Sequence, residues 1–323
     1  RALVKALIGL LTEDGIVEGS RLEKLWNARC QKEAEEQEES ARREELRVKI
    51  LSFYQGSERG NFEQFVNEGF LLIEDQQVGR GIRSLQRAVR LAGGNAPLLS
   101  FVGEHFFRTG KTRLAQSYLA RAYEFAPGDM RVSLLLGLTC ADEGDTERAK
   151  ELLNKATQRG APSFAAHYGL GRLFIAEENW RNALREFKRA LASKPSPEAH
   201  YALGCLYYQL ARDSLAARHL RKATELDADY GEAFYVLGLI YRRAGQEKLA
   251  LKSFERADTV DLDRRPKRAG RKRAGGGKPT FLPLFQGVER DVVGLFTGGN
   301  ERLAKALVKD ALDTFVAVDI ESS

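Results

Sequence analysis

The chain has 323 residues, which is enough for more than one domain, and a formal net charge of +6 with 51 cations and 45 acids. It contains no run of 18 apolar residues, which argues against a transmembrane span. The three cysteines, Cys30, Cys140 and Cys205, form no CxxC pair and fall in helical patterns, which argues against a disulfide framework.

Residues 1–60 predict an N-terminal helical extension. Residues 2–12 indicate a short apolar helix, and Ser20 with Glu23 three positions later is typical of a capping box that begins a second helix. The stretch 31–45 is almost wholly polar and acidic. Because apolar heptad positions are absent there, it favours a solvated single helix or a flexible connector over a coiled-coil arm.

Residues 61–264 repeat one short pattern six times. A glycine on the first helix of each unit recurs at 34-residue steps, with one step of 33, as Gly69, Gly103, Gly137, Gly171, Gly204 and Gly238. A small residue begins the second helix as Gly81, Ala115, Ala149, Ala183, Ala216 and Ala250. A bulky residue follows as Leu85, Leu119, Leu153, Phe187, Leu220 and Phe254, and a second small residue as Ala88, Ala122, Ala156, Ala190, Ala223 and Ala257. A fixed period of this length is the signature of a repeat architecture.

This pattern resembles the tetratricopeptide repeat. The match is plainest where Leu203, Gly204 and Tyr207 recur 34 residues later as Leu237, Gly238 and Tyr241. The resemblance implies an all-α fold, a right-handed superhelical solenoid of about six helix–turn–helix units with helical extensions at both ends. The physical reason is packing, because two helices approach closely only where side chains are small. Stacked pairs bury together what one pair cannot, and the stack presents a concave groove.

The composition changes after the repeats. Residues 264–278 hold eight cations and no acid, together with glycines and one proline, and 265–280 is predicted to be a flexible basic linker. The remaining segment, 281–323, contains an amphipathic helix that something must cover. Its apolar stripe consists of Leu303, Leu307, Ala311 and Phe315, widened by Leu312 and Val316.

No constellation of catalytic, cofactor-binding or metal-ligating residues emerges from the sequence. The four histidines lie singly in helical patterns, and none forms an HExxH motif. The glycine-rich stretch 270–278 fails as a phosphate loop, because Pro279 follows Lys278 where serine or threonine is required. We therefore expect neither an enzyme nor a cofactor or metal site.

The resemblance places a set of first-helix residues on the concave surface. Three tyrosines occupy the same slot in successive repeats and have arginines beside them, and tyrosine and arginine dominate binding hot spots. The alternative is that these tyrosines only pack between repeats. The candidate partner-binding residues are Phe107, Arg108, Tyr168, Arg172, Tyr201, Tyr208, Tyr235, Arg242 and Arg243.

The predicted function is that of a protein–protein interaction scaffold or adaptor. It would bind a peptide or helix of another protein in the groove, as a subunit or assembly factor of a larger complex. The asparagine–lysine clamp that some family members use on chaperone tails is missing. The apolar segment 279–285 is a rival occupant of the groove, since its tether gives it a high effective concentration.

An alternative function is association with nucleic acid or an anionic membrane through residues 264–278, where the electrostatic requirement is met. A folded recognition element with interleaved aromatic residues is missing from that stretch. We expect a cytoplasmic protein, and a first residue of Arg1 rather than methionine leaves a removed signal peptide open.

Overall fold

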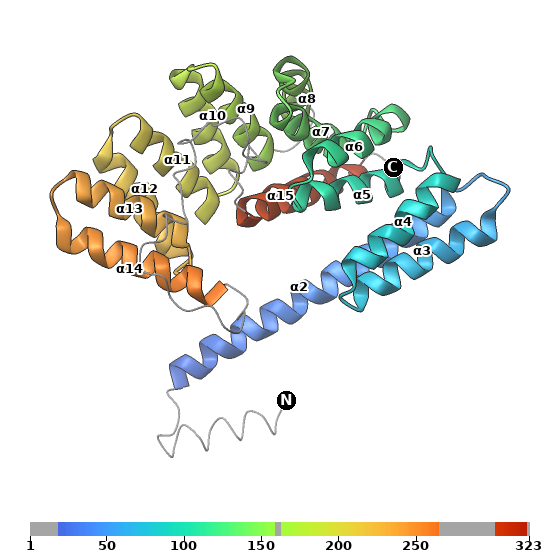
Figure 1. Ribbon diagram of the computed structural model, residues 1–323, viewed down its shortest axis with the longest axis horizontal. Helices are drawn as coiled ribbons and strands as arrows, with labels where there is room; N and C mark the ends of the chain where they lie inside the picture. Colours follow the sequence, from blue (N-terminus) through green and yellow to red (C-terminus); the bar gives the residue numbers. More distant parts are fainter. Residues whose placement is uncertain (1–18, 159–162, 265–300, 322–323) are drawn as a thin grey trace, which may run out of the picture. The chain divides into compact units, whose positions relative to one another are not determined.

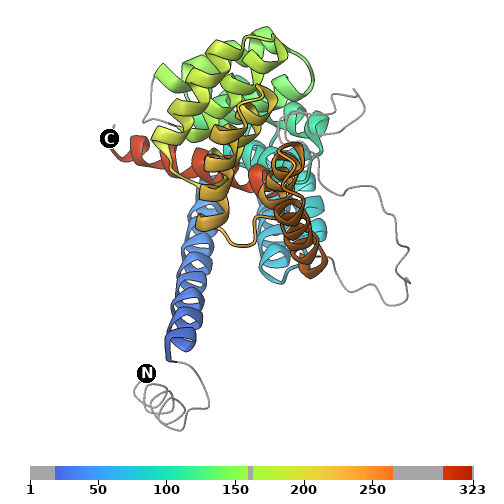
Figure 2. The same ribbon diagram turned by 90° about the vertical axis from the view of Figure 1, so that its left-hand side faces the viewer.

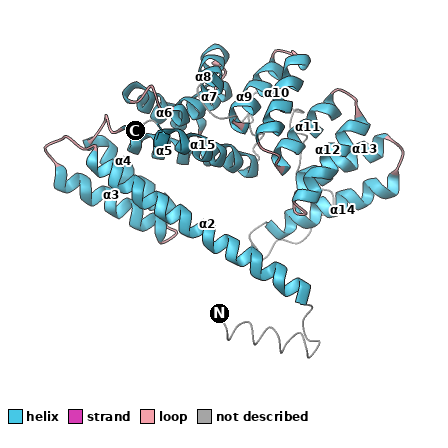
Figure 3. Ribbon diagram, turned by 180° about the vertical axis from the view of Figure 1, so that it is seen from behind, coloured by secondary structure: helices cyan, strands magenta, loops and turns pink. Residues whose placement is uncertain are grey.

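The computed structural model describes residues 19–158, 163–264 and 301–321, and every regular element in these ranges is an α-helix (Figures 1 and 3). This confirms the predicted all-α fold. None of the described helices combines the length and the apolar character that a membrane crossing requires. The predicted helix at 2–12, the basic linker 265–280 and the rival segment 279–285 lie outside the described residues.

The chain divides into two compact units, Arg1–Leu98 and Leu99–Ser323. The first unit contains α2 (Gly19–Ser52) and the first helical pair, α3 (Arg59–Glu74) with α4 (Val78–Leu91). The division falls inside α5, so the N-terminal extension and the first repeat form one unit.

The end of α2 is the part that packs against the first repeat. Ile50 is fully buried, and its carbonyl accepts a hydrogen bond of 2.8 Å from Asn95 Nδ2. Arg47 donates to Asn67 on α3 at 2.6 Å. The polar stretch earlier in α2 is an exposed helix with pairs one turn apart, such as Arg29 with Glu33. The prediction of a solvated single helix rather than a coiled-coil arm stays a prediction.

The second unit continues the helical pairs. The pairs are α5 (Ala96–Arg108) with α6 (Thr112–Phe125), α7 (Met130–Asp142) with α8 (Thr146–Gln158), α9 (Phe164–Ala176) with α10 (Trp180–Ser193), α11 (Pro197–Gln209) with α12 (Asp213–Leu226), and α13 (Gly231–Arg243) with α14 (Glu247–Arg264). Each second helix from α6 to α12 also contacts the first helix of the next pair. One further helix, α15 (Glu301–Glu321), follows the described pairs.

The repeated glycines and alanines lie at the helix crossings, as the resemblance implies. A Cβ added to Gly204 would lie 2.6 Å from Leu220 Cγ, and one added to Gly238 would lie 2.5 Å from Phe254 Cε1. Ala216 and Ala223 are fully buried in the same packing. The bulky residue of each second helix therefore fills the space that the glycine leaves on the first.

The turn between the two helices of each pair also repeats. One residue in each turn has a positive φ, and these residues are Gln76, Gly110, Gly144, Glu178, Ala211 and Gly245. They follow the same 34- and 33-residue steps as the crossing glycines. The left-handed conformation is the helix-ending geometry that glycine adopts most easily, and only three of the six turns use glycine.

Candidate protein-binding surface

The most informative feature of the second unit is the position of its last helix. α15 packs on α7 and α9, the first helices of the third and fourth repeats, and runs across them in both views (Figures 1 and 2). The first part of its apolar face is buried there, with Leu303, Ala304, Leu307, Val308 and Ala311 at most 5% exposed. Lys305 and Lys309 lie on its exposed side. The amphipathic helix predicted from the sequence is thus covered by the chain's own repeats.

The helix that α15 covers is apolar on all sides. Every residue of α7 from Met130 to Ala141, except Arg131, is buried. Its two buried hydroxyls bond within the helix, Ser133 to Asp129 O at 3.0 Å and Thr139 to Leu136 O at 2.9 Å. A helix that is hydrophobic all round requires burial on every face. Because α6, α8 and α9 cover only part of α7, α15 supplies the remaining cover.

A buried carboxylate fixes α15 to the start of α9. Asp310 is 4% exposed, and its Oδ2 accepts hydrogen bonds from Ser163 Oγ at 2.7 Å and from the Ala165 amide at 2.9 Å. Ser163 caps α9 at the same time, because its Oγ accepts from the Ala166 amide at 3.1 Å. Burial raises the pKa of the Asp310 carboxyl, while the Ala165 amide and the Ser163 hydroxyl act in the opposite direction. The two donors therefore offset part of the cost of removing this carboxylate from water.

A basic side chain fixes the other end of the same stretch. Arg302 forms an ion pair with Asp227, the residue that ends α12, and its guanidinium lies 5.0 Å from the centre of the Tyr230 ring at the start of α13. A weaker ion pair joins Asp313 to Lys194 at the end of α10, with 3.8 Å between Nζ and Oδ2. α15 therefore carries charges that match the repeat termini beneath it.

Three of the predicted partner-binding residues lie inside the solenoid. Phe107, Tyr168 and Tyr201 are 3%, 0% and 2% exposed. The Tyr168 ring packs edge-on against Phe187 of its own repeat, with ring centres 5.5 Å apart, and Tyr201 packs against Tyr230 of the next repeat at 5.1 Å. These three rings are buried among the chain's own helices, and their role in partner binding stays a prediction.

The other predicted residues are accessible but engaged. Arg243 lies over the Tyr208 ring at 4.3 Å and pairs with Asp213 through an Nε–Oδ2 distance of 2.9 Å. Arg242 lies 5.7 Å from the Phe254 ring, and the half-buried Tyr235 packs against the same ring at 5.5 Å. Tyr208, Tyr235, Arg242 and Arg243 thus form a cluster on the fifth and sixth repeats.

The two remaining candidates lie apart from that cluster. Arg108 pairs with the buried Glu104 of its own helix, with 2.8 Å between Nη2 and Oε1, and Arg172 is half-buried on α9.

The polar residues that hold α15 were not predicted from the sequence. They are Asp310, Ser163, Arg302 and Asp227. One signal was available, because Asp310 falls three residues after Leu307 and one before Ala311, inside the apolar stripe. An acid in a buried stripe requires a donor, and the donors could only be found in three dimensions.

A pair of side chains bridges the two helices of the fourth repeat, and another pair takes the equivalent positions in the fifth. In the fourth repeat His167 Nδ1 lies 2.9 Å from Glu186 Oε2, whereas in the fifth His200 Nδ1 lies 3.1 Å from His219 Nδ1. Burial, the neighbouring His200 and nearby cations lower the pKa of His219 to about 4. These pairs each join the two helices of a single repeat.

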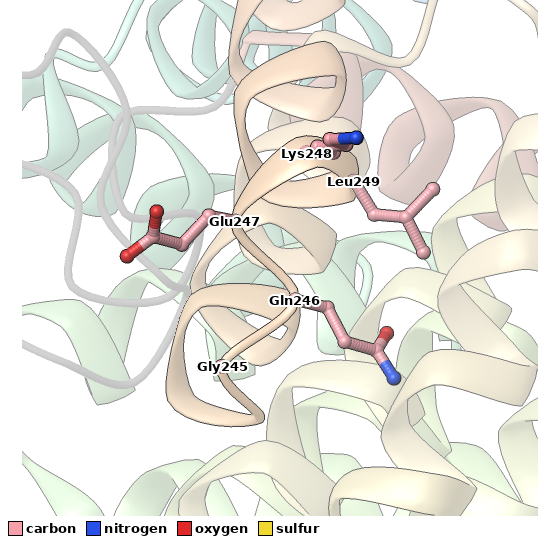
Figure 4. Close-up of a pocket in the computed structure, with 5 residues that line it drawn as sticks. All are labelled: Gly245, Gln246, Glu247, Lys248 and Leu249. Atoms are coloured by element: carbon pink, nitrogen blue, oxygen red, sulfur yellow. The ribbon is translucent and has the colours of Figure 1, made fainter.

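The described residues provide no group of three or more His, Cys, Asp or Glu side chains that could hold a metal ion. Cys140 and Cys205 are buried free thiols, and Cys30 is exposed on α2. A shallow depression lies at the turn before α14, lined by residues 245–249. Figure 4 shows the Glu247 carboxylate pointing away from the Gln246 amide, on the opposite side of the turn, so these two polar groups do not converge.

Comparisons with known proteins agree with the fold. Family models described as tetratricopeptide repeat match residues 103–165, 140–206 and 201–268, which together span about half of the chain. The Arabidopsis thaliana protein named "Protein CTR9 homolog" is 28% identical over 178 residues, and the match covers 52% of this chain but 16% of that protein. The chain therefore matches a small part of that relative's length.

Two solved structures are also similar to the chain. "MamA 41-end from Desulfovibrio magneticus RS-1" is 22% identical, covers 52% of this chain and 96% of its own, and gives a TM-score of 0.44. "YrrB: a TPR protein with an unusual peptide-binding site" is 19% identical, covers 56% of this chain and 93% of its own, and gives a TM-score of 0.40.

Proposed function

Because the chain belongs to the tetratricopeptide repeat family, we propose that it is an interaction scaffold that binds a helical segment of another protein. The binding site is the first-helix surface, defined here as the faces of α7, α9, α11 and α13 that are turned away from their own second helices. In this role the chain acts as a subunit or assembly factor of a larger complex.

One observation carries this proposal, namely that the first-helix surface already holds an amphipathic helix. More than one hundred residues separate Asp310 from its partners Ser163 and Ala165 in the sequence. The seat of α15 has the parts that a helix-in-groove site needs, namely an apolar floor and polar groups at its ends. A surface that accepts this helix accepts a second helix of similar chemistry.

The seated α15 makes binding competitive. A covalently tethered helix acts at a high effective concentration, so a partner must displace it or bind beside it. The cluster of Tyr208, Tyr235, Arg242 and Arg243 on the fifth and sixth repeats gives such a partner an accessible place to begin. Tyrosine and arginine side chains are the types on which binding energy concentrates.

The test compares full-length variants in affinity capture and titration with a captured partner. Leu303→Asp with Leu307→Asp places carboxylates where both leucines are fully buried, which unseats α15. We expect this variant to bind the partner more tightly than the unmodified chain. Adding Tyr208→Ala and Arg243→Ala should remove most of that gain, because the partner loses its contacts on the accessible cluster.

The control replaces Arg113, an exposed side chain that pairs with Glu143 at 3.1 Å on the second-helix side. Arg113→Ala should leave binding unchanged. Equal affinity of all these variants for the partner would refute the first-helix surface as the binding site.

A further inference from the structure

We infer that the first-helix surface recognises a helix of another protein by the order of its charged residues. The recognised helix has a basic residue first and an aspartate eight positions later. This inference rests on the proposed function and names the chemistry of the partner. α15 is the template, because its own side chains show which groups the repeats are built to receive.

The start of α9 binds the aspartate of this pattern. In the third repeat, Asp129 caps its own helix twice, accepting from the Arg131 amide at 2.9 Å and the Val132 amide at 3.2 Å. In the fourth repeat, Ser163 accepts only from Ala166, and the preceding amide, Ala165, donates to Asp310. The start of α9 is therefore completed by a carboxylate that arrives from another helix. Ser163 is fully buried, so an occupant without that carboxylate leaves its hydroxyl without this acceptor.

The junction of α12 and α13 binds the basic residue of the pattern. Arg302 forms an ion pair with Asp227 there and lies over the ring of Tyr230. Eight residues of helix span about 12 Å, which fixes the separation between the two anchors. Asp227 is an acid, whereas the start of α9 presents hydrogen-bond donors, so a helix that enters in the reverse direction places its aspartate beside Asp227 and its basic residue against those donors. The surface therefore selects the direction of the bound helix as well as its composition.

The apolar residues between the anchors set the rest of the pattern. Counted from the basic residue, the buried positions of α15 are the first, second, fifth, sixth and ninth, occupied by Leu303, Ala304, Leu307, Val308 and Ala311. Alanine at the second and ninth positions keeps the helix close to α7 and α9. The recognised segment is thus an amphipathic helix with a basic residue, this apolar spacing and an aspartate at the eighth position.

The experiment uses synthetic peptides of residues 299–321 and the full-length Leu307→Asp chain, whose own α15 is unseated. The unmodified peptide should bind. The peptide with Asp310→Ala should bind roughly tenfold to a hundredfold more weakly, since hydrogen bonds to a buried charge are lost. The matched peptide with Asp313→Ala removes a carboxylate whose ion pair is longer and exposed, and should change affinity less than about threefold.

A charge exchange tests the basic end. The Arg302→Asp peptide should bind poorly to the Leu307→Asp chain and regain affinity when that chain also carries Asp227→Arg. A peptide with the reversed sequence should bind far more weakly than the unmodified one. Circular dichroism checks that the chain stays helical. If it does not, a protease site inserted between Gly276 and Gly277 of the otherwise unmodified chain lets peptides exchange with a severed α15.

The outcomes separate the two claims. If the unmodified, Asp310→Ala and reversed peptides bind equally, the surface is a helix receptor without this charge order, and the inference fails while the proposed function stands. If the unmodified peptide does not bind and the severed α15 does not exchange, both fail. If peptide binding is normal but the charge exchange restores nothing, the basic end of the order is overturned.

Discussion

The fourth and fifth repeats share one sequence register and differ in what their helices require from outside. Both helices have a serine N-cap, Ser163 for α9 and Ser196 for α11, but the Ala165 amide in the first turn of α9 also donates to Asp310 of α15. The fourth repeat therefore uses a distant helix to complete its first turn. The difference teaches that a single repeat can carry a binding requirement that the repeat pattern itself does not reveal.

The bridging pairs inside these two repeats differ as well. His167 and His200 are 33 residues apart, and so are their partners Glu186 and His219. Burial tends to raise the pKa of Glu186, but the bonds from His167 and the neighbouring arginines outweigh it and lower that pKa. In the fifth repeat, two imidazoles take the place of an imidazole and a carboxylate. The same slot is thus charge-compensated in one repeat and sensitive to acid in the other.

The largest expected effect on stability comes from displacing α15 from the repeats, because the start of α9 then loses its hydrogen bonds to Asp310. Leu307 is fully buried, and Leu307→Asp places a carboxylate in that apolar contact, which costs several kcal/mol if no partner compensates it. We expect amide hydrogen exchange to accelerate in α15 and at Ala165, while α11 changes little. Lys305→Asp, on the exposed side of the same helix, is the control. Unchanged protection of α15 in the Leu307→Asp chain would contradict its seating.

A smaller loss of stability is expected when the glycine at the helix crossing, which both repeats share, is replaced by alanine. Gly204→Ala brings a Cβ to 2.6 Å from Leu220 Cγ, and overpacking of this kind costs about 1–3 kcal/mol. Gly171→Ala meets the Phe187 ring at 2.9 Å and should cost a similar amount. Gly79→Ala on α4 meets nothing within 4 Å and should be neutral or stabilising by up to about 1 kcal/mol. Chemical denaturation measures all three, and equal stabilities would refute the crossing register.

The pH dependence of stability sharpens the difference between the bridging pairs. The pKa of His219 is about 4 in the folded chain against 6.5 for an unperturbed histidine, so the unfolded chain binds the proton more readily. Stability from this group is therefore complete above about pH 6.5 and is lost as the pH falls toward 4, by at most about 1.4 kcal/mol per pH unit.

His219→Glu copies the carboxylate of the fourth repeat and serves as the comparison for that acid loss. Denaturation midpoints of the two chains should diverge in favour of His219→Glu between about pH 6.5 and 4.5. Other carboxylates titrate in both chains, so the difference between the chains reports the pair. Parallel curves over this window would show that the histidine pair does not govern the acid response.

The smallest expected effect on stability lies at the accessible cluster of the fifth and sixth repeats. Arg243 is 42% exposed, and its ion pair and ring contact should together be worth about 1 kcal/mol or less. Arg243→Ala should therefore leave the melting temperature nearly unchanged while it weakens partner binding. A large loss of stability would instead show that Arg243 has a structural role between repeats.

Much of the fold could be read from particular residues because the repeat rule is local. Gly204 and Leu220 are 16 residues apart, and their contact recurs at every equivalent pair, so one pattern predicted the crossing throughout the array. The candidate site was harder to predict. Tyr168 and Tyr201 share a slot with Tyr235, yet the first two are buried and the third is half-buried. Exposure depends on what neighbouring helices and α15 cover, and periodicity does not record that.

The sequence by itself determined the repeat, its register and the amphipathic nature of the last helix, because each follows from the spacing of small and apolar residues along the chain. Only the tertiary structure decided where that helix lies. Asp310 meets Ser163 across more than one hundred residues, and no local preference encodes such a contact. It forms because α7 needs cover on its remaining face and because the start of α9 offers two donors to one buried carboxylate.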